Sequence, residues 1–365
     1  MHHAQVETLR APARKRASLS QTGHGWQQAM REAVTDIDTL CALLELGESQ
    51  RSALAAVTTG FGLRVPRSYI ARMRRGDIND PLLRQVLPIA AENEAVPGFG
   101  IDAVGDHTSA LGDGVLHKYH GRALLVTTGA CAVHCRYCFR RHFDYANQHA
   151  GARQGEAALA HIAADPSINE VILSGGDPLS LSNARLDALA RALDDIDHVT
   201  RIRIHTRTAV VLPERIDAGL VAWVRERRQQ CVIVIHANHA QELDDTVGAR
   251  LAELRAAGAT LLNQAVLLKK VNDRVDTLIE LSERLFALGV MPYYLHLLDR
   301  VAGSAHFEVD LARARDLVDR VAARLPGYLV PRLARETAGD AAKQVFGHDA
   351  GPSAADTRGS ERGKD

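Results

Sequence analysis

Residues 123–138 read ALLVTTGACAVHCRYC, a short apolar run followed at once by three cysteines, Cys131, Cys135 and Cys138. Three thiolates this close in sequence can converge on one metal centre. Most cubane iron–sulfur clusters take four cysteine ligands, so three would leave one iron open to bind another molecule. The alternative is a zinc site completed by His134 or His142. The stretch therefore predicts a metal centre directly after a β-strand.

Short apolar runs alternate with amphipathic stretches from about residue 126 to residue 297. Beyond the first gap the runs begin roughly 30 residues apart, and apolar residues recur at three- and four-residue spacing between them. This alternation is typical of βαβ units with parallel strands. Predicted strands are 123–127, 171–173, 202–205, 231–236, 261–268 and 293–297, and predicted helices are 185–196, 218–228, 245–257, 276–288 and 310–325. Pro213 is placed at a helix start, and 327–333 is read as a further extended segment.

Six such units are too few for the usual closed eight-stranded barrel. We expect an α/β fold built as a partial (β/α)6 TIM-like barrel, with its chemistry at the C-terminal ends of the strands. A helical extension would precede the barrel, and a further segment would follow it. The predicted organisation is a mostly helical region at 1–105, the barrel at 106–300, a C-terminal helix and lysine-bearing segment at 301–346, and a disordered tail at 347–365.

Composition narrows the partners and the cellular location that we expect for this protein. The 44 basic residues balance 44 acidic ones, which gives no electrostatic reason to expect nucleic acid or a membrane as partner. No apolar run reaches the roughly eighteen residues of a transmembrane helix, and the N-terminus lacks an apolar signal core. Five cysteines, three of them within eight residues, do not suit a disulfide framework. We therefore expect a cytoplasmic protein.

The spacing CxxxCxxC resembles that of the radical S-adenosylmethionine (SAM) superfamily. The resemblance implies a [4Fe–4S] cluster on Cys131, Cys135 and Cys138 whose open iron binds SAM. After the second predicted strand, Ser174, Gly175, Gly176 and Asp177 match the turn at which the superfamily binds the ammonium group of SAM. The other reading of this tetrapeptide is an ordinary turn at a strand end.

Within that superfamily the chain resembles the lysine 2,3-aminomutases. The matching stretches are HKYHGRALL from His117, CAVHCRYCFRR from Cys131, LSGGD from Leu173, RTAVVLP from Arg207, LNQAVLL from Leu262 and MPYY from Met291. They run in family order over about residues 65–346. The chain looks most like the short bacterial branch that makes (R)-β-lysine for the modification of elongation factor P. The longer degradative members bind a structural zinc through C-terminal cysteines, and this chain has none after Cys231.

The resemblance also implies pyridoxal 5′-phosphate (PLP). Moving an amine between neighbouring carbons through a radical needs a π-system, and the pyridine ring can delocalise the unpaired electron. A lysine holds this cofactor as a Schiff base between turnovers. Of the six lysines, Lys343 matches the family position. Lys118, which stands where the family usually has arginine, and Tyr119, Arg122 and Gln264 match positions on the phosphate side of PLP.

Three charged residues match the family's substrate site. Arg140 matches the residue that binds the amino-acid carboxylate, a task suited to a guanidinium fork. Asp299 and Glu336 match two acids that hold the distal ammonium of lysine, although the second is commonly aspartate. His236 could contact SAM, or it could equally be a satisfied core histidine.

We therefore predict a radical SAM, PLP-dependent L-lysine 2,3-aminomutase, an isomerase that forms (R)-β-lysine. An aminomutase for glutamate or arginine is one alternative, although two acids facing a glutamate side chain would repel it. A non-catalytic partner of the elongation factor P machinery is the other, and an intact Lys343 and Arg140 argue against it. The resemblance also implies a flavodoxin- or ferredoxin-type electron donor and a functional link to elongation factor P and its ligase. We expect a homo-oligomer.

Overall fold

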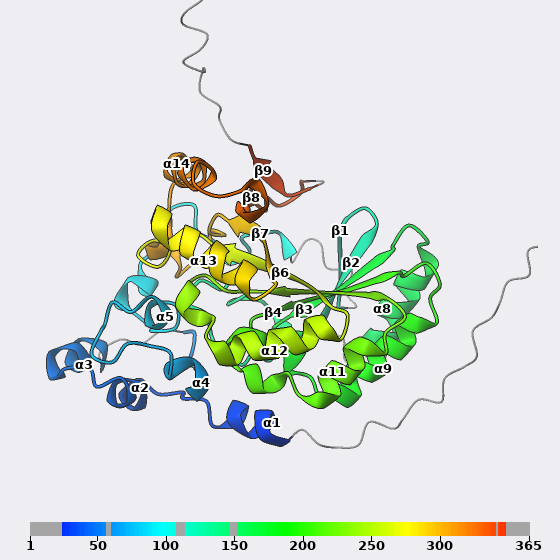
Figure 1. Cartoon of the computed structure of the whole chain (residues 1–365), viewed down its shortest axis with the longest axis horizontal. Coiled ribbons are helices and arrows are strands. Elements are labelled where there is room, and N and C mark those ends of the chain that lie inside the picture. Colours follow the sequence, from blue (N-terminus) through cyan, green and yellow to red (C-terminus); the bar gives the residue numbers. More distant parts are fainter. Residues whose placement is uncertain (1–23, 56–59, 107–113, 146–151, 341, 348–365) are drawn as a thin grey trace, which may run out of the picture.

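The computed structural model describes residues 24–55, 60–106, 114–145, 152–340 and 342–347. Its centre is a nine-stranded sheet in which every strand lies beside its neighbours in sequence, in the order β1 to β9 (Figure 1). Strands β2 to β8 are parallel, whereas β1 and β9 pair antiparallel at the two edges. The two edge strands are not paired with each other in this sheet, so the barrel is partial rather than closed.

Six βα units precede strand β8, which confirms the predicted partial (β/α)6 barrel. The strands are β1 Val115–Tyr119, β2 Arg122–Thr128, β3 Glu170–Gly175, β4 Arg201–Thr206, β5 Gln230–Ile235, β6 Thr260–Val266, β7 Met291–His296, β8 Arg332–Arg335 and β9 Gln344–Phe346. The connecting helices are α8 Ala152–Ala164, α9 Asn183–Asp194, α11 Ala218–Arg225, α12 Asp245–Ala256, α13 Val275–Ala287 and α14 Leu311–Ala322, and short elements between them are η2 Pro178–Ser180, α10 Thr208–Val211, η3 Pro213–Arg215, η4 Ala240–Glu242, η5 Ala305–Phe307 and η6 Gly327–Leu329.

The alternation of side chains along each strand separates the core from the site. On β4, Ile202 and Ile204 are buried in the main apolar core under the helices, whereas Arg203 and His205 line an internal cavity. Helices α9, α11 and α12 lie side by side along the outer face of the sheet (Figure 1). Short polar side chains begin these helices, as when Asp217 accepts a hydrogen bond from the backbone N–H of Leu220. The fold thus presents polar side chains to the barrel interior.

A second apolar core lies under the N-terminal helices α1 His24–Arg31, α2 Ile37–Leu43, α3 Glu48–Ala55, α4 Arg67–Ile70, α5 Pro81–Arg84 and η1 Ala90–Asn93. It includes Ala132 and Val133, which flank the first cysteine, and Val211 and Leu212 after β4. The N-terminal region thus supports the cysteine loop from outside the barrel. The division at residues 105, 300 and 346 stays a proposal, and the tail predicted at 347–365 lies, beyond residue 347, outside the described residues.

The structure corrects the prediction at several points. Segment 327–333 is not extended throughout, because η6 occupies its first half and the strand β8 begins only at Arg332. Pro213 begins the short η3, and α11 starts five residues later, at Ala218. In its described residues, 24–55 and 60–105, the N-terminal region contains short helices joined by irregular chain. No helix of the described residues is long and apolar enough to cross a membrane.

Candidate active site

A cavity of about 520 Å³ lies at the C-terminal ends of the parallel strands. All the site residues predicted from the sequence line it, together with His236. They come from the cysteine loop, the turns after β3 and β5, strands β1, β2 and β6, and the segments after β7 and β8. The fold therefore brings into one cavity residues that lie more than 200 positions apart in the sequence.

The loop that carries the cysteines is held in place by N-terminal residues. The backbone N–H of His134 donates to the carbonyl of Arg64 at 2.9 Å, and that of Arg136 donates to the carbonyl of Gln85 at 2.8 Å. The fully buried guanidinium of Arg136 also pairs with Glu92, with 2.8 Å from Nε to Oε1. These contacts fix the loop on the side that faces away from the cavity.

Burial favours the neutral form of the three thiols while no cation lies beside them. Burial raises the pKa of Cys131 well above its usual value, raises that of Cys135, and raises that of Cys138 to about 11. A buried thiolate is costly without a cation beside it, and bound iron supplies that cation. The chemistry of this donor set therefore fits an iron–sulfur cluster.

The zinc alternative finds no support in the geometry. Nowhere in the described ranges do three His, Cys, Asp or Glu side chains gather closely enough to hold a single metal ion. A [4Fe–4S] cluster does not need that convergence, because each thiolate binds a different iron. The expected extra zinc ligands are engaged elsewhere: His134 Nδ1 lies 3.0 Å from the carbonyl of Gly62, and His142 Nε2 lies 3.2 Å from that of Ala302.

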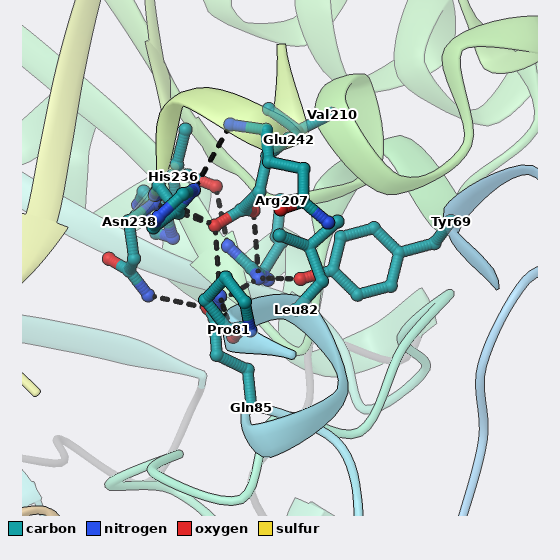
Figure 2. A network of polar contacts seen from close by, with 12 residues as sticks. Tyr69, Pro81, Leu82, Gln85, Arg207, Val210, His236, Asn238 and Glu242 are labelled. Atoms are coloured by element: carbon teal, nitrogen blue, oxygen red, sulfur yellow. Dashed lines mark hydrogen bonds and ion pairs between the residues drawn. The ribbon is translucent and has the colours of Figure 1, made fainter. Parts of the chain in front are cut away.

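A buried polar network connects the cysteine loop to the ends of β4 and β5 (Figure 2). Arg207, directly after β4, forms an ion pair with Glu242 at 3.0 Å and donates to Gln85 Oε1 at 2.9 Å. Asn238, after β5, donates from Nδ2 to the same Gln85 oxygen at 2.9 Å and to the hydroxyl of Tyr137 at 2.8 Å. Because Tyr137 lies between the second and third cysteines, the network ties their loop to the barrel.

The glycine turn after β3 packs against the start of the cysteine loop. A Cβ on Gly176 would overlap the carbonyl of Ala130, and Gly175 adopts φ +118°, a conformation that favours glycine. The carboxylate of Asp177 accepts hydrogen bonds within the protein, from Thr206 Oγ1 at 2.9 Å and from the backbone N–H of Arg207 at 2.8 Å. This carboxylate is committed to joining β3 and β4, and SAM binding at the turn stays a prediction.

Five side chains of alternating charge form a chain across the cavity. Arg140 Nε lies 2.7 Å from Asp106 Oδ2, and Asp106 Oδ1 lies 2.6 Å from Lys118 Nζ. Lys118 in turn lies 3.2 Å from Glu336, which lies 2.9 Å from Lys343. The expected carboxylate-binding, phosphate-binding and Schiff-base residues are thus electrostatically connected. Sequence analysis missed Asp106, which lies in no recognisable motif.

Asp299, one of the two predicted acids, has a buried carboxylate oxygen without a hydrogen-bond partner among the described residues. Burial, reinforced by the nearby charge of Glu336, raises the pKa of Asp299 to about 7, although Lys343 opposes the shift. Within the described chain its Oδ1 has no hydrogen-bond partner. A buried polar atom left unpaired costs about 1–3 kcal/mol. A ligand that donates a hydrogen bond to Asp299 would remove this cost.

Three histidines at strand ends add unpaired nitrogens to the same wall. Among the described residues, the Nε2 atoms of His205, His236 and His296 are buried without partners. Burial, together with the positive charge of Lys343, lowers the pKa of each imidazole, that of His236 to about 3. The wall is therefore neutral and polar. Sequence analysis did not select His205 or His296, although both stand at C-terminal strand ends, where the barrel places its chemistry.

The expected phosphate side of the cavity is basic and aromatic. The guanidinium of Arg122 stacks over the ring of Tyr119 at 4.8 Å, and burial raises the pKa of this tyrosine. Lys118 and Gln264 line the same cavity, Gln264 from strand β6. The cations and neutral donors on this side suit a phosphate group. The unpaired histidine nitrogens described above suit other polar groups of a ligand. These residues fit PLP.

Comparisons with known proteins agree with this geometry. Residues 125–220 match the Radical SAM superfamily. The chain is 46% identical to an L-lysine 2,3-aminomutase of Escherichia coli (strain K12), covering 93% of this chain and 97% of the relative. It is 40% identical to one of Haemophilus influenzae, covering 88% and 95%, and 29% identical to one of Clostridium subterminale, covering 87% and 76%. Membership of the superfamily implies a [4Fe–4S] cluster and SAM. The chain belongs to the L-lysine 2,3-aminomutase family of radical SAM enzymes.

Proposed function

We propose that this chain is an L-lysine 2,3-aminomutase that converts L-lysine to (R)-β-lysine with a [4Fe–4S] cluster, SAM and PLP. One observation carries the proposal: the guanidinium of Arg140 and the carboxylates of Asp299 and Glu336 line the same cavity. A substrate with a carboxylate at one end and an ammonium at the other matches this distribution of charge. The names of the relatives support the same substrate.

Each residue of the cavity has a distinct task in this proposal. Cys131, Cys135 and Cys138 would hold the cluster, and Lys343 would bind PLP covalently. When bound, the cluster and SAM supply a radical that abstracts hydrogen from the β-carbon of substrate, and PLP supplies the π-system across which nitrogen migrates. Arg140 anchors the carboxylate and the acids hold the side chain, so that the β-carbon stays within reach of the hydrogen-abstracting group.

Glu336 has two roles in this arrangement. In the structure it pairs with Lys118 and Lys343, both expected partners of PLP. Once these two lysines engage the cofactor, the Glu336 carboxylate becomes available to the ε-ammonium of the substrate. Asp299, whose Oδ1 has no hydrogen-bond partner within the described chain, would receive the other N–H groups of the ammonium. Glu336 in place of the commoner aspartate would reach further into the cavity.

Two rival functions remain distinguishable by experiment. An aminomutase for arginine would also match two acids, whereas glutamate would meet them with a like charge. A non-catalytic partner of the elongation factor P machinery would not need Lys343 and Arg140 in one cavity. The resemblance to the short bacterial branch supports the finer proposals: a role in β-lysylation of elongation factor P, a flavodoxin- or ferredoxin-type donor, a homo-oligomer and a cytoplasmic location.

Anaerobic reconstitution followed by a turnover assay tests the proposal. The reconstituted protein, supplied with SAM, PLP and a chemical reductant, is given L-lysine, L-arginine or L-glutamate in separate reactions. We expect β-lysine from lysine alone, and chiral derivatisation should identify it as the R form. Conversion of arginine or glutamate in preference to lysine would overturn the substrate. No turnover of any of the three, with cluster and PLP both bound, would support the non-catalytic alternative.

A further inference from the structure

Asp106 connects two subsites that the proposed function treats separately. It is buried, and its two carboxylate oxygens contact different cations: Oδ2 lies 2.7 Å from Arg140 Nε, and Oδ1 lies 2.6 Å from Lys118 Nζ. Its own backbone N–H donates to Asp102 Oδ1 at 2.9 Å, which helps to fix the position of the residue. Burial alone would raise the pKa of this carboxyl, but the two cations hold it below its usual value.

Apart from Asp106, the printed acceptors of Arg140 are neutral, whereas Lys118 also contacts the carboxylate of Glu336 at 3.2 Å. Arg140 donates from Nη1 to Ser174 Oγ at 3.0 Å and to the carbonyl of Gly175 at 3.3 Å. Lys118 donates to the carbonyl of Val104 at 2.9 Å. Asp106 is therefore the charged group that holds both cations in orientation.

The carboxylate of Asp106 reduces the repulsion between the two cations that it contacts, Arg140 and Lys118. Without it, Arg140 and Lys118 would repel each other in a poorly solvated cavity, and each would move toward the nearest acid. With it, the guanidinium and the ammonium are held a fixed distance apart, and the longer contact to Glu336 is the one that Lys118 would exchange for a ligand. An incoming carboxylate and an incoming phosphate would then meet cations that are already oriented.

We propose that Asp106 is a positioning residue that joins the substrate-carboxylate subsite at Arg140 and the phosphate subsite at Lys118 into one unit. This inference rests on the proposed function, because it assigns lysine and PLP to those subsites. It predicts that one substitution at Asp106 weakens both ligands, although Asp106 touches neither. A residue with a merely structural role would change stability and iron content without weakening both ligands.

The test uses Asp106→Asn in the reconstituted holoprotein and in the PLP-free protein. Asparagine keeps the shape of the side chain, but it removes the charge and turns a donor toward one cation. We expect the Kd for PLP, from titration of the PLP-free protein, and the KM for lysine each to rise about tenfold or more. Iron per chain should stay close to that of the parent, although the midpoint of thermal unfolding should fall because two cations lose their shared partner. Asp316→Asn, in an exposed ion pair on α14, is the matched control and should change neither constant.

A double mutant tests the coupling directly. If Asp106 acts on PLP through Lys118, then Lys118→Gln combined with Asp106→Asn should bind PLP no more weakly than Lys118→Gln alone. Additive losses would overturn the inference, as would a change confined to one ligand. Should Asp106→Asn fail to fold, Asp106→Glu keeps the charge with a longer reach and should raise both constants by a smaller factor.

The outcomes separate this inference from the proposed function. A parent protein that neither binds PLP nor converts lysine would overturn the function, and the inference with it. A parent that does both, with Asp106→Asn indistinguishable from it, would overturn the inference alone.

Discussion

The carboxylate of Glu336 and the ammonium of Lys343 form an ion pair at 2.9 Å, and both side chains are about one-fifth exposed. The residue proposed to recognise substrate thus contacts the residue proposed to bind PLP. Lys343 must leave this pair before it can act as an amine toward the cofactor. Substrate recognition and cofactor attachment therefore use the same carboxylate in turn.

The position of the Schiff-base lysine can be mapped chemically. Borohydride reduction of the resting holoprotein should attach PLP irreversibly to Lys343, which lines the cavity, lies 2.9 Å from Glu336 and matches the family's Schiff-base position. Peptide mapping by mass spectrometry would identify the modified residue. A cofactor found on Lys269 or Lys270 would contradict the assignment.

Substrate binding should depend on Asp299. Asp299→Asn removes the charge that faces the substrate ammonium, so kcat/KM for lysine should fall about tenfold or more. Glu336→Asp keeps its charge and should have a milder effect. Steady-state kinetics with lysine would measure both variants, with the spectra of cluster and PLP as controls. Parental kcat/KM in Asp299→Asn would show that the side-chain site lies elsewhere.

The same residue predicts a pH dependence. The Asp299 carboxyl, with a pKa of about 7, is neutral below that pH and charged above it. The ε-ammonium of lysine stays charged over this range, so its binding should strengthen as the pH rises through 7. The KM for lysine should therefore fall between pH 6 and pH 8, the range about 1 unit either side of that pKa. This fall in KM with rising pH should disappear in Asp299→Asn. If the fall persists in that variant, another titrating group causes it.

Iron content should follow the three cysteines. The protein reconstituted without oxygen should bind about four irons per chain and show a [4Fe–4S] spectrum. Cys135→Ala should lose turnover and most of the iron, because two thiolates hold a cubane poorly. Cys231→Ala, at a buried cysteine in the core, is the control and should keep its iron. Stoichiometric zinc in the parent, isolated anaerobically, would contradict the cluster.

The network of Figure 2 predicts a large effect on stability. Glu242→Gln leaves the buried charge of Arg207 without its partner, which typically costs about 3–5 kcal/mol. Urea unfolding should show a lower midpoint, and iron should be lost because the network holds the cysteine loop. Asp316→Asn, in an exposed pair with Arg313, should cost less than about 1 kcal/mol. Equal midpoints for the two variants would show that the network does not stabilise the loop.

The parallel strands were predictable from sequence because they are buried on both faces and read as apolar runs. The predicted runs at 123–127 and 231–236 lie within two residues of β2 and β5. Strand β9 was missed, and the predicted extended segment 327–333 overlaps only the start of β8, because these strands are three and four residues long and carry exposed positions. Such short strands, at or next to the edge of the sheet, form because of the strand with which they pair and not because of a local sequence pattern.

The site residues also divide into those that sequence motifs reveal and those that only the fold brings together. Residues in motifs, such as Cys131 and Arg140, were predicted because their spacing is visible in the chain. Asp106 was not, because its role depends on two distances, to Arg140 and to Lys118, that only the fold creates. His205 and His296 could have been found by asking which polar residues end a predicted strand.

Lys343 stands beside β9, after all eight other strands of the sheet in chain order. A ribosome therefore completes the cluster loop and most of the barrel well before it adds this lysine. Any protein truncated upstream of β9 could carry iron and yet would have no amine for PLP. Under the proposed function, PLP attached to Lys343 would report that the chain extends past the barrel, and borohydride reduction of a clipped chain would fix no PLP at this position.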